Sequence, residues 1–270
     1  MEIKTKERFS RTTMLIGQEG NLILDKAKVL VFGVGGVGGF VVEALARAGV
    51  GHITIVDMDV VSESNINRQI IADYSTIGQY KVDVMSRRIK SINPDCTVEP
   101  LKMYYTPGDS ESEAIDFRMF DFIVDAIDTV KSKIDIIKRA CDLKVPVISS
   151  MGTGNKLDNT AFEIVPIRKT SICPLAKVMR KELKKLGITE VPVLYSKAKP
   201  IEVVQGEADL KEAGSTLDEG NLGPRKKMPP GSISYVPATA GLIIAGYVVN
   251  QLLYHGCNGL DGLSFTCNNN

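Results

Sequence analysis

The stretch "VFGVGGVGG" at residues 31–39, followed by "ITIVDMD" at 53–59, is the strongest indication of the fold in this chain. Gly33, Gly35 and Gly38 match the pattern G-x-G-x-x-G between an apolar run and a helix-like run, and Asp57 follows nineteen residues after the last glycine. Such glycines permit a tight turn and let a phosphate approach backbone N–H groups at the start of a helix, while the acid binds ribose hydroxyls. The stretch predicts a nucleotide site and leaves the identity of the nucleotide open.

Strand-like and helix-like segments alternate around this stretch. The strand-like runs cover 28–33, 53–57, 121–127 and 145–150, and the helix-like segments cover 37–48, 80–92 and 130–143. This alternation predicts an α/β fold with a Rossmann-like, mostly parallel sheet and helices on both faces.

The pattern changes after residue 155. We expect strands at 160–167 and 191–196, a helix at 173–187 stopped by Gly187, a mobile loop at 197–231 and a core helix at about 238–254. The expected parts are therefore an N-terminal helical arm (1–27), a nucleotide-binding domain (28–155) and a C-terminal part (156–270) that forms a small subdomain.

The composition narrows the class of protein. A chain of 270 residues with 44% hydrophobic and 24% charged residues can bury one substantial core, and its net charge of +1 attracts neither nucleic acid nor membrane overall. The longest apolar run, at 238–249, is shorter than the ~20 residues of a spanning helix, so we expect a buried helix and no integral membrane span. Contact with a membrane surface stays open.

The cysteines indicate a reducing cytoplasm and no structural zinc, because they stand singly without a CxxC pair and no signal peptide is recognisable. They are Cys96, Cys141, Cys173, Cys257 and Cys267.

Charged side chains beyond Asp57 favour a triphosphate over NAD. Arg68 and Lys81 can both face the carboxyl edge of the sheet, where two cations suit a triphosphate. The two histidines, His52 and His255, pair with no carboxylate for hydride chemistry and are expected to be structural or surface residues.

Two acids lie in or directly after the strand-like run at 121–127. Asp128 follows this run and is the expected ligand for Mg²⁺ held on nucleotide phosphates. Asp125 lies within the run and is expected to be a hydrogen-bonded structural acid.

Taken in order, the motifs resemble the adenylating fold shared by ubiquitin-activating enzymes and the bacterial proteins ThiF and MoeB. They are "RFSR" (8–11), "VFGVGGVGG", "IVDMD", "SNINRQ", "GQYKV", "INPD" (92–95) and "DAID", and they span residues 8–155. The resemblance implies activation of a carboxylate by ATP as an acyl-adenylate, with release of pyrophosphate. It also implies a homodimer, because in this family an arginine near the N-terminus reaches the partner subunit's ATP, and Arg11 occupies that place.

The expected site divides into catalytic and nucleotide-binding residues. The catalytic set is Arg68, Lys81, Asp128 and Arg11. The nucleotide-binding set is Gly33, Gly35, Gly36, Gly38, Asp57, Asp59, Ser64, Asn65, Arg68, Gln69, Lys81, Asp128 and Thr129.

Further motifs resemble one branch of this family, the tRNA threonylcarbamoyladenosine dehydratases (TcdA, also called CsdL). They are "GVGGFVVEALARAGVGHITIVDMD", "NINRQ", "DAIDTVKSK", "CPLAKVMRKELKKLGI" and "GSISYVPATAG". The branch lacks the zinc clamp of the sulfur-carrier activators. Its implied reaction adenylates the threonyl carboxylate of a modified adenosine in tRNA, after which internal attack closes a ring and expels AMP.

Two alternatives remain at this point. One is a ThiF or MoeB type adenylyltransferase for the C-terminal glycine of a ubiquitin-like sulfur carrier, although such activators usually carry two CxxC pairs that this chain lacks. The other is a nucleotide-dependent RNA-binding or scaffold protein without turnover. A sulfur-transfer partner protein, with which some relatives cooperate, is also left open.

The charge is locally segregated in a way that suits tRNA. Between residues 168 and 199 there are nine Lys or Arg residues against two Glu residues, a local net charge of +7. The candidate tRNA contacts are Lys177, Arg180, Lys181 and Lys184, which recur at helical spacing. A second basic cluster, at 225–227, lies in the expected loop, and a solvated basic helix is the competing interpretation.

Cys173 has two interpretations. It precedes Pro174 at an expected helix start, where the pKa of a thiol falls, so both a catalytic nucleophile and a structural residue are open. Ser232 stands where some members of the branch carry a cysteine, so the sequence supports no obligatory thiol there.

Overall fold

The structure, a computed structural model, describes residues 6–202 and 230–256, apart from the side chains of 255 and 256. Its described residues form a seven-stranded sheet in the order β3-β2-β1-β4-β5-β7-β6. All neighbouring strands are parallel except β6, which runs antiparallel to β7. The strands are β1 (Lys28–Phe32), β2 (His52–Val56), β3 (Thr97–Leu101), β4 (Phe122–Asp125), β5 (Val147–Ser150), β6 (Phe162–Pro166) and β7 (Pro192–Ser196).

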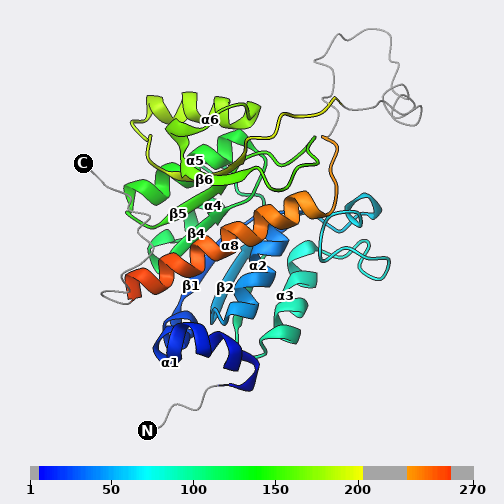
Figure 1. Ribbon diagram of the computed structural model, residues 1–270, viewed down its shortest axis with the longest axis vertical. Helices are drawn as coiled ribbons and strands as arrows, with labels where there is room; N and C mark the ends of the chain where they lie inside the picture. Colours follow the sequence, from blue (N-terminus) through cyan, green and yellow to red (C-terminus); the bar gives the residue numbers. More distant parts are fainter. Residues whose placement is uncertain (1–5, 203–229, 257–270) are drawn as a thin grey trace.

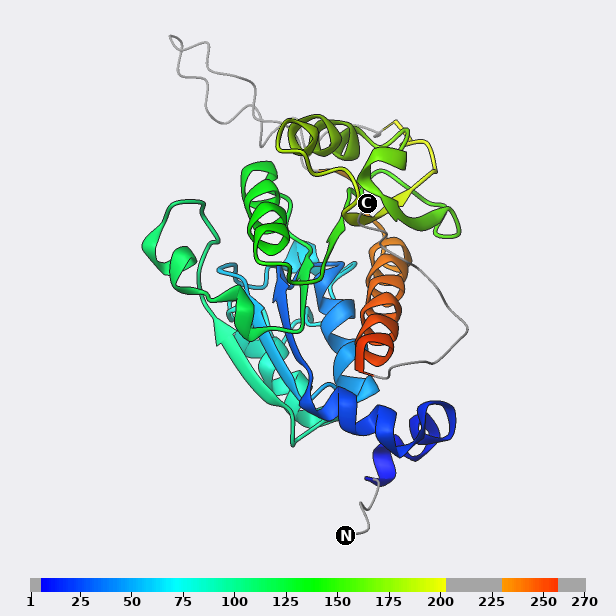
Figure 2. The same cartoon turned by 90° about the vertical axis from the view of Figure 1, so that its left-hand side faces the viewer.

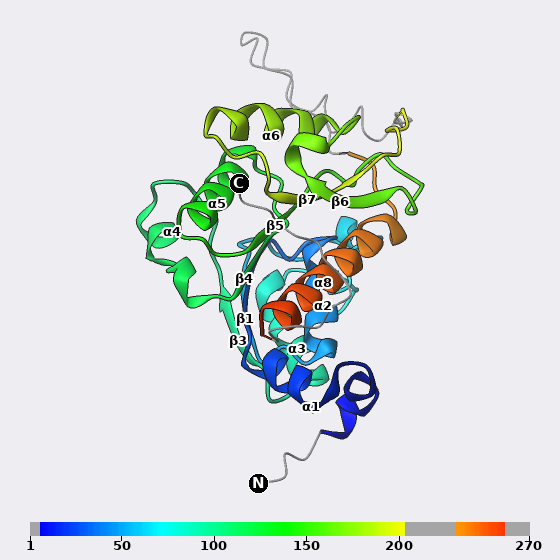
Figure 3. The same cartoon turned by 60° about the vertical axis from the view of Figure 1, so that its left-hand side comes forward.

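Helices cover both faces of the sheet (Figures 1 and 3). One layer holds α1 (Ser10–Lys26), α2 (Gly38–Ala48), α3 (Lys81–Ile92) and α8 (Tyr235–Gly256), and the other holds α4 (Ser110–Ala114), α5 (Val130–Asp142) and α6 (Pro174–Lys185). Single 3₁₀ turns are η1 (Glu7–Phe9), η2 (Glu63–Asn65), η3 (Phe117–Met119) and η4 (Ile167–Lys169).

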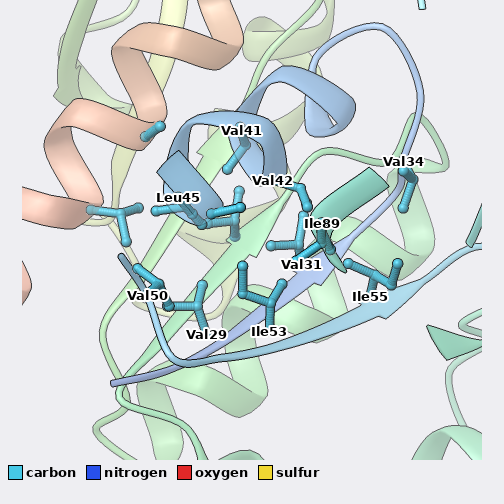
Figure 4. Close-up of a cluster of buried hydrophobic side chains, with 14 of the residues drawn as sticks. Val29, Val31, Val34, Val41, Val42, Leu45, Val50, Ile53, Ile55 and Ile89 are labelled. Carbon is cyan, nitrogen blue, oxygen red and sulfur yellow. The ribbon is translucent and has the colours of Figure 1, made fainter. Parts of the chain in front are cut away.

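The buried strands explain the continuous apolar runs of the sequence. Successive side chains of a strand point to opposite faces, so a strand covered on both sides is apolar throughout. In β1, Val29 and Val31 join the core under α2 and α8, whereas Leu30 and Phe32 join the core under α5 and α6. Figure 4 shows the first of these cores.

Helix α8 lies against α2 (Figure 2). Gly241 makes the close approach possible, because a Cβ there would lie 2.5 Å from the carbonyl oxygen of Val37 at the start of α2. The span Tyr235–Tyr254 is long and apolar enough to cross a membrane by composition, but half of its most apolar window is buried inside the protein. Together with its packing on α2, this burial supports the predicted core helix.

The structure differs from the sequence prediction in two places. Strand β3 was not expected, because its sequence TVEPL contains a glutamate and a proline instead of an apolar run. The C-terminal strands were expected in a separate small unit, but β7 pairs with β5 and continues the main sheet. The predicted loop 197–231 lies largely outside the described residues, as does the basic cluster at 225–227.

Candidate nucleotide site

The glycine loop joins the end of β1 to the start of α2. Gly33 has a φ of +87°, and a Cβ on Gly38 would lie 1.8 Å from the carbonyl oxygen of Gly33, so these two glycines are required by the turn itself. A Cβ on Gly35 would meet no atom closer than 3.9 Å. The loop therefore has one open position where a phosphate can approach the backbone.

Asp57 lies beside this loop. Its carboxylate accepts hydrogen bonds from the backbone N–H groups of Val34, at 2.7 Å, and Asp59, at 2.9 Å. Burial raises the pKa of Asp57, while the nearby charge of Lys81 and the two N–H groups act in the opposite direction. Because a carboxylate has about four acceptor positions, it can still accept hydrogen bonds from ribose hydroxyls.

The two predicted cations lie at the same edge. Lys81 is buried at the first position of α3, and its Nζ is 2.7 Å from Oδ2 of Asp59. Nη1 of Arg68 donates to the carbonyl oxygen of Ser64, at 2.7 Å, and to Oδ1 of Asn67, at 2.9 Å. Both cations are held in place by protein groups. Their remaining N–H donors have no partner among the described residues, so they can donate to a phosphate.

The loop after β2 supplies two buried amides. Asn65 closes a capping box on η2 by accepting from the N–H of Ser62, which orders the loop before Arg68. Gln69 is 7% exposed, and its Oε1 has no hydrogen-bond partner among the described residues. A buried polar atom without a partner is costly, so Gln69 marks a position where a ligand fits.

Asp128 and Thr129 lie between β4 and α5, and Thr129 is the residue that precedes the helix. The Asp128 carboxylate is exposed and forms no hydrogen bond or ion pair with another described residue. Within residues 6–202 and 230–256, no cluster of three or more metal-ligating side chains occurs. A single free carboxylate nevertheless suits Mg²⁺, which is commonly held by one or two carboxylates together with nucleotide phosphates.

A buried ion pair stabilises the segment between β4 and α5 that carries Asp128. Asp125 and Lys133 are both fully buried, with Nζ of Lys133 2.9 Å from Oδ2 of Asp125 and 3.1 Å from the carbonyl oxygen of Ile127. Ser149 donates to the same Asp125 oxygen at 2.6 Å. The expected structural role of Asp125 is confirmed.

These groups surround one pocket of about 570 Å³, a volume typical of small-molecule sites. Eleven of the predicted residues line it, namely Gly33, Gly35, Gly36, Asp57, Asp59, Asn65, Arg68, Gln69, Lys81, Asp128 and Thr129. Gly38 lies under the loop, and Ser64 contributes its carbonyl oxygen to Arg68 instead of lining the pocket. Arg11 is exposed on α1 and also does not line it.

The pocket has further walls that the sequence did not reveal. One contains Met103, Tyr104 and Tyr105, which follow β3. Another contains Thr153 and Gly154 after β5, with Pro230 and Ser232 before α8. Recognising β3 as a strand would have placed the first group at the carboxyl edge of the sheet, whereas nothing local in the sequence indicates the second group.

The basic side chains of α6 differ in whether they have a partner within the described part of the protein. Lys177, Lys181 and Lys184 are exposed and form no ion pair with another described residue. Nη1 of Arg180 instead donates to the carbonyl oxygen and the hydroxyl of Thr170, both at 2.6 Å, so this predicted contact has a structural role.

Cys173 is 3% exposed and packs in the core under α6. It is not among the residues that line the nucleotide pocket. A nucleophile has to reach its substrate, so this position favours the structural interpretation. His52, at the start of β2, lies outside the pocket lining as well, and the side chain of His255 is outside the described residues.

Comparisons with known proteins agree on one family. The family model described as the ThiF family matches residues 9–269. The chain is 47% identical over 247 residues to a Bacillus subtilis protein named tRNA threonylcarbamoyladenosine dehydratase, covering 91% of this chain and 94% of that protein. An Escherichia coli protein with the same name is 37% identical over 179 residues, 66% of each chain. A solved structure of the E. coli enzyme TcdA in complex with ATP matches with a TM-score of 0.79 and 27% identity, covering 94% of this chain and 98% of that one.

Proposed function

This chain belongs to the ThiF family, and we propose that it is an ATP-dependent tRNA threonylcarbamoyladenosine dehydratase. The threonyl carboxylate of the modified adenosine attacks the α-phosphorus of ATP, which forms an acyl-adenylate and releases pyrophosphate. A carbamoyl nitrogen or oxygen then attacks the acyl carbon and expels AMP. The nucleoside loses one water in total, while ATP becomes AMP and pyrophosphate.

The observation that carries this proposal is the convergence of three kinds of group on one pocket. The open glycine loop provides backbone donors, Lys81 and Arg68 provide positive charge, and Asp128 provides a free carboxylate. A carboxylate that attacks a triphosphate meets a strongly negative chain, so the protein has mainly to align the reactants and neutralise charge.

Each side chain has a distinct task in this scheme. Asp57 holds the ribose. Lys81, oriented by Asp59, and Arg68, oriented by Ser64 and Asn67, donate to the phosphates. Mg²⁺ held by Asp128 supplies further charge neutralisation when it is bound with ATP. No protein nucleophile is required, which agrees with the buried position of Cys173.

The substrate class follows from the relatives' name and from charge. Helix α6 presents Lys177, Lys181 and Lys184 at a spacing of four and three residues, so they lie on one exposed face. Each phosphate neutralised by such a side chain releases counterions, which makes RNA binding depend on salt. We assign these three lysines to the tRNA backbone.

We further propose that the active form is a homodimer in the cytoplasm. Helix α1 precedes β1 and so lies at the amino end of that strand, whereas the pocket lies at its carboxyl end (Figure 1). This placement supports the proposal that Arg11, which does not line the pocket of its own chain, acts in the pocket of a partner subunit. A sulfur-transfer protein is a further candidate partner.

The decisive experiment supplies ATP with tRNA that carries the threonylcarbamoyl group. We expect formation of AMP and pyrophosphate only with the modified tRNA, and a loss of one water from the nucleoside by mass spectrometry. Activity with a diglycine-ended carrier protein and none with tRNA would favour the sulfur-carrier alternative. Binding of ATP and tRNA without turnover would favour a scaffold.

The tRNA face can be tested separately. Replacing Lys181 and Lys184 by alanine should weaken tRNA binding. It should also lower the steepness with which the logarithm of the binding constant falls with the logarithm of the salt concentration, by about two. Lys185 is the matched control, because it lies on the same helix but is paired with Glu182 at 2.6 Å. An unchanged salt slope in the double variant would exclude this face from the RNA interface.

A further inference from the structure

A second hollow adjoins the nucleotide pocket. Its volume is about 500 Å³, and the two hollows share a wall that consists of Met58, Asp59, Asn65, Lys81 and Tyr104. The second hollow adds Val60, Ser62 and Tyr80. None of the residues that it adds has a role in the scheme above.

Two exposed aromatic rings line this hollow. Tyr104 is 68% exposed and Tyr80 is 37% exposed. Nζ of Lys102 lies 4.9 Å from the centre of the Tyr80 ring and is paired with Asp83 at 2.8 Å. Exposed large apolar groups gathered beside a pocket indicate a binding surface more often than single exposed residues do.

The aromatic hollow is held rigidly. Val60 and Tyr80 form an isolated antiparallel bridge, and the N–H of Lys81 donates to the carbonyl oxygen of Asp59 at 3.0 Å. The hydroxyl of Tyr104 lies 3.4 Å from Oδ1 of Asp59. Because the backbone at Tyr80 is fixed by this bridge, its ring can bind a flat ligand at low entropic cost.

The chemistry of the hollow suits a nucleobase. Aromatic rings stack on bases whatever their sequence, and unpaired loop nucleotides of RNA are commonly recognised in this way. The acids nearby do not repel RNA strongly, because Asp59 is paired with Lys81 and Asp83 with Lys102.

We propose that Tyr104 and Tyr80 form a stacking site for an unpaired base of the RNA substrate, next to the nucleotide whose carboxylate reacts. This inference rests on the proposed function, since it requires an RNA nucleotide in the adjoining pocket. The shared wall makes the two hollows adjacent, so an RNA with one nucleotide in the first pocket can place a neighbouring base in the second. ATP is placed in the first pocket by the glycine loop, Asp57 and the phosphate-binding cations, which leaves the second hollow for RNA.

The test measures RNA affinities of Tyr104→Ala and Tyr104→Phe in the full chain. The RNA probe is an anticodon stem-loop that carries threonylcarbamoyladenosine, with either natural neighbours or an abasic nucleotide beside the modified base. With natural RNA, Tyr104→Ala should weaken binding roughly 5- to 150-fold and Tyr104→Phe by less than about twofold, because phenylalanine keeps the stacking face. Because Tyr104 also lines the nucleotide pocket, the ATP comparison uses Tyr80→Ala, since Tyr80 lines only the second hollow. Tyr80→Ala should weaken RNA binding and leave the affinity for ATP unchanged.

The abasic probe identifies the stacking partner. It should bind the wild type about as weakly as natural RNA binds Tyr104→Ala, and the alanine substitution should cause no further loss with it. Tyr74→Ala is the matched control, because Tyr74 is 79% exposed and lines neither hollow, and it should bind like the wild type.

Three outcomes would overturn the stacking site. They are equal RNA affinities of Tyr104→Ala and wild type, a loss of ATP affinity alone in Tyr80→Ala, or a change of oligomeric mass that shows the rings to be covered by a second copy. If wild type itself neither binds nor dehydrates the modified tRNA, the proposed function fails instead, so the two failures are distinguishable.

Discussion

Replacing Lys133 by methionine tests whether the buried ion pair supports the loop that carries Asp128. Both partners are fully buried, and Lys133 also donates to the carbonyl oxygen of Ile127 in that loop. Removing one partner of a buried pair leaves an uncompensated charge and costs about 3–5 kcal/mol. For a chain of this size, that cost corresponds to a fall in melting temperature of roughly 6 to 20 °C.

The assay is thermal and urea unfolding of Lys133→Met beside two comparison variants. Lys138→Met changes the same residue type on the same helix, but Lys138 is about half exposed and paired with exposed Asp142, so its loss should lower the stability far less than Lys133→Met. The double variant Asp125→Asn with Lys133→Met removes both charges and should recover much of the stability. Equal destabilisation by Lys133→Met and Lys138→Met would show that burial gives the Asp125–Lys133 pair no special weight in stability.

Three other substitutions test the remaining parts of the site and its support. Gly38→Ala places a Cβ 1.8 Å from the carbonyl oxygen of Gly33, so it should abolish ATP binding measured by calorimetry. The control Gly246→Ala, whose Cβ would meet no atom within 4 Å, should bind ATP like the wild type. Arg68→Ala removes charged hydrogen bonds and should raise the Kd for ATP roughly 10- to 150-fold, with an unchanged far-UV spectrum; a wild-type Kd would exclude the phosphate role. Burial raises the pKa of Glu43, but hydrogen bonds from Arg88 and Arg47 outweigh this effect and lower the pKa below 4.5 in the folded protein. The ionised carboxylate therefore stabilises the fold above pH 4.5 and loses this effect as the pH falls through the lowered pKa. The difference in unfolding free energy between Glu43→Gln and wild type should shrink in acid. A difference that does not depend on pH would contradict this role.

The strands and the glycine loop could be predicted because their causes are local. Buried parallel strands have to be apolar on both faces, and a turn with φ of +87° at Gly33 requires glycine. Strand β3 escaped prediction because it is an edge strand, where Glu99 and Pro100 are tolerated. The residues after it, Tyr104 and Tyr105, were missed for the same reason.

The roles of charged side chains were predicted less well than their positions. Lys81 and Arg68 lie at the pocket as expected, but their partners Asp59 and Ser64 could not be read from spacing. Arg180 has the same helical spacing as its lysine neighbours and is nevertheless tied to Thr170. Spacing decides which helix face a residue occupies, and only the neighbouring segment decides whether a charge is free.

The phosphate loop and the strand–helix alternation that builds the sheet follow from the sequence alone, because each depends on residues close together in the chain. The acids and cations at the carboxyl edge follow from where the predicted strands end. Which distant segments complete the site is known only from the folded protein. Thr153 and Gly154 meet Pro230 and Ser232 at one wall, and the tyrosines of the second hollow meet at another, although long stretches of chain separate them. The physical reason is that parallel strands end at a common edge, where loops far apart in sequence become neighbours.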